Sequence, residues 1–219
     1  MYDCLTSNES GNNHNNIWKA KLPYKIKIFL WLMVNNAILT KDNMIRRKWQ
    51  GDSSCQFCDQ TETVDHLFFT CPISKVVWGC IARCLGANNV PSNANQYWSW
   101  IKNWLPNGNS VYTLCLAAIC WATWKTRNKS CFERKRIKHP CEIVCYACSL
   151  MQCWTGLYKE DFQSQMTKCI NTLLSIAVDL MATRSSTPSL MLTNGTTHIS
   201  EDSDKTEDEG GQGSGGAEN

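Results

Sequence analysis

The sequence predicts a mainly α-helical protein in which a small N-terminal helical module, carrying a cysteine knuckle, precedes a helical C-terminal region, with disordered ends. Apolar residues recur at helical spacing between residues 17 and 183, and alternating strand patterns are few. Both ends of the 219-residue chain are polar and cannot bury apolar surface. We expect a disordered N-terminus over 1–16, the module over 17–86, a linker over 87–95, the helical region over 96–183 and a disordered acidic tail over 184–219.

The module should contain three helices. Pro23 suits the first turn of a helix that continues to Asn36, and Thr40 is a candidate N-cap of a second. The apolar residues of the first helix predict a buried face, made of Ile26, Phe29, Leu30 and Met33. A third helix should begin at Pro72 and continue to Leu85. The residues expected to face inward from it are Val76, Val77, Cys80 and Cys84.

The C-terminal region shows two longer helical patterns. The first covers residues 110–135 and begins with an uncharged stretch, residues 111–124. This stretch is shorter than the roughly 20 residues needed to span a bilayer, so it predicts a core helix, with Trp121 and Trp124 on one face. The second pattern covers residues 140–181, with an interruption near residues 159–161.

The residues with the clearest chemistry form the array Cys55-x2-Cys58-x7-His66-x4-Cys71. Three thiolates and one imidazole at this spacing can close tetrahedrally on one zinc ion. The N-terminal residues lack the basic start and apolar run of a signal peptide, so we expect an intracellular protein, nuclear or cytoplasmic, with reduced thiols. Metal binding is then favoured over disulfides. The alternative interpretation is that the cysteines are small buried apolar residues.

The local sequence also suits such a site. Residues 63–70 predict a short helical turn that presents His66 beside the knuckle of Cys55 and Cys58. Cys71 precedes Pro72, which biases it away from helical backbone angles and places it at a helix N-cap. Free N–H groups and the helix dipole favour a thiolate there.

The surroundings of the array carry a resemblance. The matching pieces are Ile17-Trp18-Lys19, residues 22–31, residues 39–47, the Cys55 and Cys58 pair, residues 62–68, Cys71-Pro72 and Trp78. Together, over about residues 17–85, they resemble the zinc-binding domain that follows the polymerase in reverse transcriptases of plant non-LTR (LINE-type) retrotransposons. Residues 121–132 are similar to the helical stretch that leads into a ribonuclease H domain. The resemblance implies a retrotransposon-derived fragment, and we expect it to lack the polymerase and ribonuclease H domains.

Positive charge is concentrated in the module, where Asp42 is the one acidic residue between positions 17 and 50. The candidate nucleic-acid-binding residues are Lys19, Lys21, Lys25, Lys27, Arg46, Arg47 and Lys48. Basic surface beside a zinc knuckle and exposed aromatics suits RNA or other single-stranded nucleic acid. A solvated helix face is the alternative interpretation. A second basic run occupies residues 125–138, and the acidic block at 201–209 either competes with phosphate or only keeps the protein soluble.

A second cysteine pattern, Cys141-x3-Cys145-x2-Cys148, has the spacing of some iron–sulfur sites. It lies in an amphipathic helical pattern, so we interpret these cysteines as packed on a helix. The apolar stripe of that helix is predicted to consist of Ile143, Ala147, Leu150 and Trp154.

Three functional hypotheses follow. The preferred one is a zinc-dependent, nucleic-acid-binding accessory module, and the alternatives are a protein-interaction domain with structural zinc and a non-functional remnant. We expect no catalytic residues, because four protein ligands leave zinc no open position for water. Neither a membrane nor a small-molecule substrate is expected as a partner.

Overall fold

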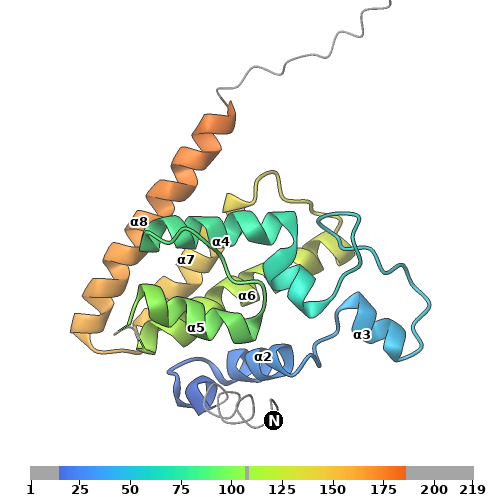
Figure 1. Cartoon of the computed structure of the whole chain (residues 1–219), viewed down its shortest axis with the longest axis horizontal. Coiled ribbons are helices and arrows are strands. Elements are labelled where there is room, and N and C mark those ends of the chain that lie inside the picture. The colour runs from blue at the N-terminus through green and yellow to red at the C-terminus, as the bar shows by residue number, and fades with distance from the viewer. Residues whose placement is uncertain (1–14, 107–108, 186–219) are drawn as a thin grey trace, which may run out of the picture. The chain divides into compact units, whose positions relative to one another are not determined.

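A computed structural model describes residues 15–106 and 109–185, which are mainly α-helical, as predicted. Its helices are α2 (Tyr24–Val34), α3 (Lys41–Arg46), η1 (His66–Thr70), α4 (Pro72–Leu85), α5 (Ala94–Trp104), α6 (Asn109–Phe132), α7 (Cys141–Thr155) and α8 (Glu160–Ser185) (Figure 1). Within the described ranges, extended pairing is limited to one isolated antiparallel bridge, Ser54 with Thr61.

The expectations for the two ends fall mostly outside the described residues, which leave out 1–14 and 186–219. Where the ranges overlap, the structure corrects the prediction. Residues 15–19 are helical, and α8 continues through Arg184 to Ser185. The predicted acidic block at 201–209 is likewise outside the described part of the chain.

The helices of the predicted module begin and end close to their expected limits. Pro23 precedes α2, and all four residues predicted for its inner face are buried. Thr40 occupies the N-cap position of α3, where its hydroxyl donates a hydrogen bond to Asp42 Oδ1 at 2.5 Å. Helix α4 has the predicted bounds, with Pro72 in its first turn.

The predicted inner face of α4 needs one correction. Val77 and Cys80 are buried and Cys84 is partly buried, but 37% of Val76 is exposed. The face that packs inward includes Trp78 and lies one position further round the helix than the sequence suggested. Each residue turns an α-helix by about 100°, so a buried face centred on Val77, Trp78 and Ile81 directs Val76 toward solvent.

Helix α5 begins inside the predicted linker. The side chain of Asn93 accepts a hydrogen bond from the backbone N–H of Gln96 at 2.8 Å, which caps the first turn. Tyr97, Trp98 and Trp100 are buried, so this helix contributes a large aromatic surface to the core.

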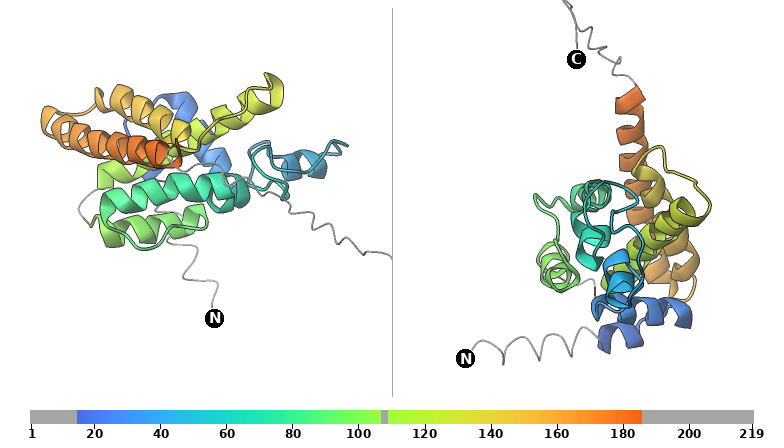
Figure 2. Two further views of the ribbon diagram at one scale, coloured as in Figure 1. Left: turned by 90° about the horizontal axis from the view of Figure 1, so that it is seen from above. Right: turned by 90° about the vertical axis from the view of Figure 1, so that its right-hand side faces the viewer.

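One core joins the two predicted regions. Helix α6 packs against α7, α2 and η1, while α4 packs against α8 and α7 (Figures 1 and 2). Phe29 of α2 contacts Trp121 of α6 edge-on, with ring centroids 5.0 Å apart, and also contacts Trp124. All described residues belong to one compact unit. The domain boundary at residues 87–95 stays a prediction.

The long C-terminal patterns form α6, α7 and α8. The uncharged stretch of α6 is largely buried, as expected of a core helix. No helix in the described ranges is both long enough and apolar enough to cross a membrane. A short non-helical turn separates Thr155, the end of α7, from Glu160, the start of α8, close to the predicted interruption. In α7, Ile143, Ala147 and Trp154 are buried and Leu150 is partly buried.

Candidate metal centre

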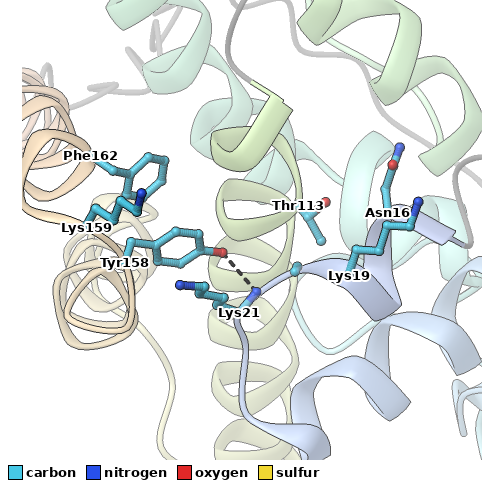
Figure 3. A pocket seen from close by; sticks show the side chains of 8 residues that line it. Asn16, Lys19, Lys21, Thr113, Tyr158, Lys159 and Phe162 are labelled. Atoms are coloured by element: carbon cyan, nitrogen blue, oxygen red, sulfur yellow. Dashed lines mark hydrogen bonds between the residues drawn. The ribbon is translucent and has the colours of Figure 1, made fainter.

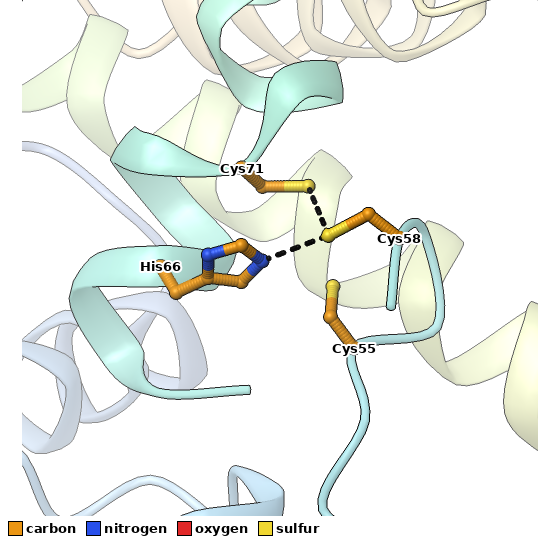
Figure 4. Close-up of side chains that lie close together, drawn as sticks. All are labelled: Cys55, Cys58, His66 and Cys71. Atoms are coloured by element: carbon orange, nitrogen blue, oxygen red, sulfur yellow. Dashed lines mark hydrogen bonds between the residues drawn. The ribbon is translucent and has the colours of Figure 1, made fainter. Parts of the chain in front are cut away.

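The first two candidate ligands lie on a tight loop. The bridge between Ser54 and Thr61 folds the chain back on itself, and the backbone N–H of Cys55 donates to the carbonyl of Gln60 at 2.7 Å. The return of the chain within so few residues brings Cys55 and Cys58 to the same side of the loop (Figure 4). We call residues 51–61 the knuckle loop.

The other two candidate ligands come from the helical side. The backbone N–H of His66 donates to the Thr63 hydroxyl at 3.1 Å, which starts the turn that becomes η1. The N–H of Cys71 donates to the carbonyl of His66 at 2.7 Å, a five-residue bond of the π-helical type. Cys71 is the N-cap residue of α4 and is extended (ψ 140°) before Pro72, as predicted.

The structure brings these four side chains together. The Sγ atoms of Cys55, Cys58 and Cys71 and a ring nitrogen of His66 all lie within 4.8 Å of one another (Figure 4). Cys58 Sγ is 3.2 Å from His66 Nε2 and 3.9 Å from Cys71 Sγ. Zinc bonds of about 2.3 Å to sulfur and about 2.0 Å to nitrogen at tetrahedral angles separate ligand atoms by roughly 3.5–3.8 Å. The cluster therefore has the donor set and the size of a metal site.

Burial and mutual hydrogen bonds determine the protonation of the three thiols. A hydrogen bond from Cys55 to Cys71 lowers the pKa of Cys71, and the same bond, together with burial, raises the pKa of Cys55. Burial also raises the pKa of Cys58, although the backbone N–H of Gln60 opposes that shift. Crowded sulfurs resist losing all their protons because the negative charges repel. A bound cation would favour three thiolates.

The environment also suits His66 as a ligand. Its side chain is buried, and this desolvation lowers its pKa, which favours the neutral imidazole that metals bind. The next three residues, Leu67, Phe68 and Phe69, are buried in the core and fix the backbone of η1. Phe69 stacks on Trp78 of α4 with ring centroids 5.5 Å apart. The histidine is thus held by the rigid part of the fold.

A buried ion pair lies beside this centre and was missed by the sequence analysis. Glu62 Oε2 accepts a hydrogen bond from Arg127 Nε at 3.1 Å, and Oε1 accepts one from Arg127 Nη2 at 2.5 Å. Oε1 also accepts from the backbone N–H of Lys41 at 3.0 Å. The sequence analysis placed Arg127 in the basic run 125–138, but its side chain is 2% exposed. The ion pair connects α6 to the loop segment before His66.

The second cysteine pattern is part of the packing. Cys141 and Cys148 are buried on α7, and Cys145 is partly buried, which confirms the helix interpretation. Among the residues that the structure describes, the group of Cys55, Cys58, His66 and Cys71 is the one set of His, Cys, Asp or Glu side chains placed to hold a metal ion.

The seven candidate nucleic-acid-binding residues are placed in two groups. Lys19, Lys21, Lys25 and Lys27 precede or begin α2, and Arg46, Arg47 and Lys48 lie at the end of α3. Helix α2, about 16 Å long at 1.5 Å per residue, lies between them (Figure 1). Six of the seven are exposed and Lys27 is partly buried. The sequence analysis treated these seven residues as one basic surface, whereas the structure places them in two separate groups.

Local partners differ among these residues. Arg46 pairs with Asp42 at 2.8 Å, so part of its charge is already neutralised. Lys27 Nζ donates to the carbonyl of Trp18 at 2.9 Å, and Lys25 Nζ lies 5.4 Å from the ring centroid of Trp121. In the described part of the chain, no ion pair to a carboxylate involves Lys19, Lys21, Arg47 or Lys48.

Comparison with known proteins agrees with the resemblance drawn from the residues. Residues 1–78 match the model of a family described as zinc-binding in reverse transcriptase, and all four clustered residues lie within the match. The chain is 26% identical over 142 residues to a candidate ribonuclease H protein of Arabidopsis thaliana. That alignment covers 58% of this chain and 22% of the relative. No solved structure matches the chain significantly.

Proposed function

We propose that the clustered side chains of Cys55, Cys58, His66 and Cys71 hold one zinc ion, because residues 1–78 match the model of a family described as zinc-binding in reverse transcriptase. The observation that supports this most directly is the convergence of three sulfurs and one imidazole within 4.8 Å. Zinc bound there would cross-link the knuckle loop to η1 and α4 and would have no open position for a substrate. The proposed role is therefore accessory and non-catalytic, in a module derived from a retrotransposon.

Elemental analysis of the purified full chain tests the zinc proposal. We expect one zinc per chain, and a Cys58→Ser/Cys71→Ser variant should lose it because two of four ligands are removed. The matched control is Cys153→Ser/Cys169→Ser, which changes two exposed cysteines of α7 and α8 and should keep the metal. Stoichiometric zinc in the first variant, or two metals per wild-type chain, would overturn the ligand assignment.

The partner that best suits the exposed charge is RNA or single-stranded nucleic acid. Lysine and arginine side chains that lack carboxylate partners are available for phosphate. Exposed aromatic rings accompany both groups: Trp18 beside Lys19, and Trp49 beside Lys48, each about two-fifths exposed. Unpaired bases can stack on such rings, whereas the bases of a duplex are already stacked.

A fluorescence titration of the full chain with single-stranded RNA at several salt concentrations tests this partner. Arg46→Glu/Arg47→Glu should weaken binding and flatten the log–log salt slope by about one, at roughly 0.7 per phosphate contact on a single strand. Arg47 should contribute more than Arg46, which already pairs with Asp42. The control is Lys102→Glu/Lys168→Glu, on exposed positions of α5 and α8. Equal effects of both variants would contradict the proposed surface.

A second candidate function is protein interaction, supported by exposed residues of α2 and of the helical turn before it. Trp18, Tyr24, Ile28 and Trp31 are 38–70% exposed, although each is large and apolar or aromatic. Grouped exposed residues of this kind are typical of interaction sites. If wild-type protein shows no RNA binding at low salt, the nucleic-acid proposal falls and this alternative is favoured.

A further inference from the structure

A second concave site, which shares no residue with the metal cluster, lies where residues 16–21 face the beginning of α8. Its volume is about 440 Å³, within the range of roughly 300–1,000 Å³ usual for small-ligand pockets. The lining residues that carry chemistry are Lys19, Lys21, Tyr158, Lys159 and Phe162 (Figure 3). The sequence analysis linked two of these lysines with nucleic acid and did not consider the residues from α8.

The pocket has an ordered aromatic wall. Tyr158 stacks on Phe162, with ring centroids 4.3 Å apart and an interplanar angle of 24°. The backbone N–H of Lys21 donates to the Tyr158 hydroxyl at 3.1 Å (Figure 3). This bond joins segments 137 residues apart in the sequence. The stack and this hydrogen bond place the two rings beside residues 16–21.

The charge of the lining is positive. Lys19, Lys21 and Lys159 contribute three ammonium groups, and no carboxylate is among the lining residues. Lys21 Nζ lies 5.7 Å from the ring centroid of Tyr158, so the cationic and aromatic parts of the lining adjoin. Glu160 and Asp161 follow Lys159 in the first turn of α8, but neither lines the pocket. The lining thus favours a ligand that joins an anion to a flat ring.

We propose that this pocket binds one unpaired nucleotide, with its phosphate near the lysines and its base against the Tyr158–Phe162 wall. The inference deepens the proposed function and rests on it, because it names the place where a single strand would contact the protein. Stacking accepts any base, so binding should show little sequence preference. A free mononucleotide also joins a phosphate to a base, so the experiment compares single-stranded RNA with adenosine monophosphate.

The test uses the full chain and a short fluorescein-labelled single-stranded RNA, with adenosine monophosphate and inorganic phosphate as separate titrants. Phe162→Ala should weaken RNA binding about tenfold, because a base–aromatic contact is lost, and Phe162→Tyr should restore it. Lys159→Glu should weaken binding and flatten the salt slope by about 0.7. Lys168→Glu, on an exposed position of α8 outside the pocket, is the control. Circular dichroism checks the folding of each variant.

The outcomes separate this site from the general function. If wild-type protein binds RNA and both pocket variants bind as tightly as Lys168→Glu, the pocket proposal falls and the proposed function stands. If RNA does not bind but adenosine monophosphate does, and Lys159→Glu abolishes that binding, the pocket is a free-nucleotide site and the nucleic-acid part of the proposed function falls. If neither RNA nor adenosine monophosphate binds, the nucleotide assignment is overturned. It is also overturned if inorganic phosphate binds as tightly as adenosine monophosphate. Lys159 is exposed, so its variant keeps the test valid even if Phe162→Ala does not fold.

Discussion

The knuckle loop and the helical core are stabilised by different means. The loop is held by backbone bonds, the Ser54–Thr61 bridge and a hydrogen bond from Lys41 Nζ to the Ser54 carbonyl, and its one aromatic residue, Phe57, is only partly buried. The core around α4, α6 and α7 buries side chains such as Trp78 and Leu114 completely. A region with little apolar burial has little to offset its conformational entropy, so the loop depends on other contacts.

The four candidate ligands are divided between these two regions. Cys55 and Cys58 belong to the loop, whereas His66 and Cys71 belong to η1 and the start of α4, beside buried phenylalanines. Bound metal would therefore connect a weakly packed segment to a well-packed one. Because η1 is packed into the core, we expect metal removal to unfold the knuckle loop and to leave η1 in place.

The largest expected effect comes from metal removal. Structural zinc contributes about 10–16 kcal/mol in isolated zinc-finger peptides, and here it should control the loop alone. We expect a chelator to abolish amide hydrogen-exchange protection at residues 51–61 and to leave the protection of α6 and α7 nearly unchanged. Exchange measured by mass spectrometry before and after chelation, with zinc re-addition as the control, provides the readout. Loss of protection throughout α6 would show that the core depends on the metal as well.

The buried ion pair joins the two regions without metal, and its disruption should have the next largest effect. Arg127→Met leaves the Glu62 carboxylate buried without its cation and should cost about 3–5 kcal/mol in the free energy of unfolding. Urea denaturation of zinc-loaded protein measures the change. Lys129→Met, on an exposed position of the same helix, should cost less than about 1 kcal/mol.

A double variant separates the charge from the packing at this pair. In Glu62→Gln/Arg127→Met no buried charge is left uncompensated, so much of the lost stability should return. If the double variant is no more stable than Arg127→Met, the cost comes from the guanidinium's packing, including its position 5.1 Å from the Trp124 ring centroid. A cost below about 1 kcal/mol for Arg127→Met alone would mean that solvent reaches the pair.

The sequence predicted local features well and long-range ones poorly, for a physical reason. The cluster from Cys55 to Cys71 was readable because short spacing and Pro72 determine its geometry. The Glu62–Arg127 pair joins residues 65 apart, and no local pattern distinguishes a charge that will be buried from one that will be solvated. The pocket beside α8 depends on the same kind of contact. The sequence analysis assigned no separate helix to residues 94–104, and the polar residues before α5 are typical of a linker.

The smallest expected effect tests the register of α4, where the sequence predicted two inward valines and the structure buries one. Val77→Ala should cost about 1–3 kcal/mol, because Val77 is 1% exposed and its removal leaves a cavity in the core. Val76→Ala should cost less than about 0.5 kcal/mol, because Val76 is 37% exposed and alanine has the higher helix propensity. The two variants differ from wild type by the same atoms in the same helix, so their difference in urea denaturation isolates burial. Equal costs would mean that α4 is rotated from the position described, and with it the Cys71 end of the metal centre.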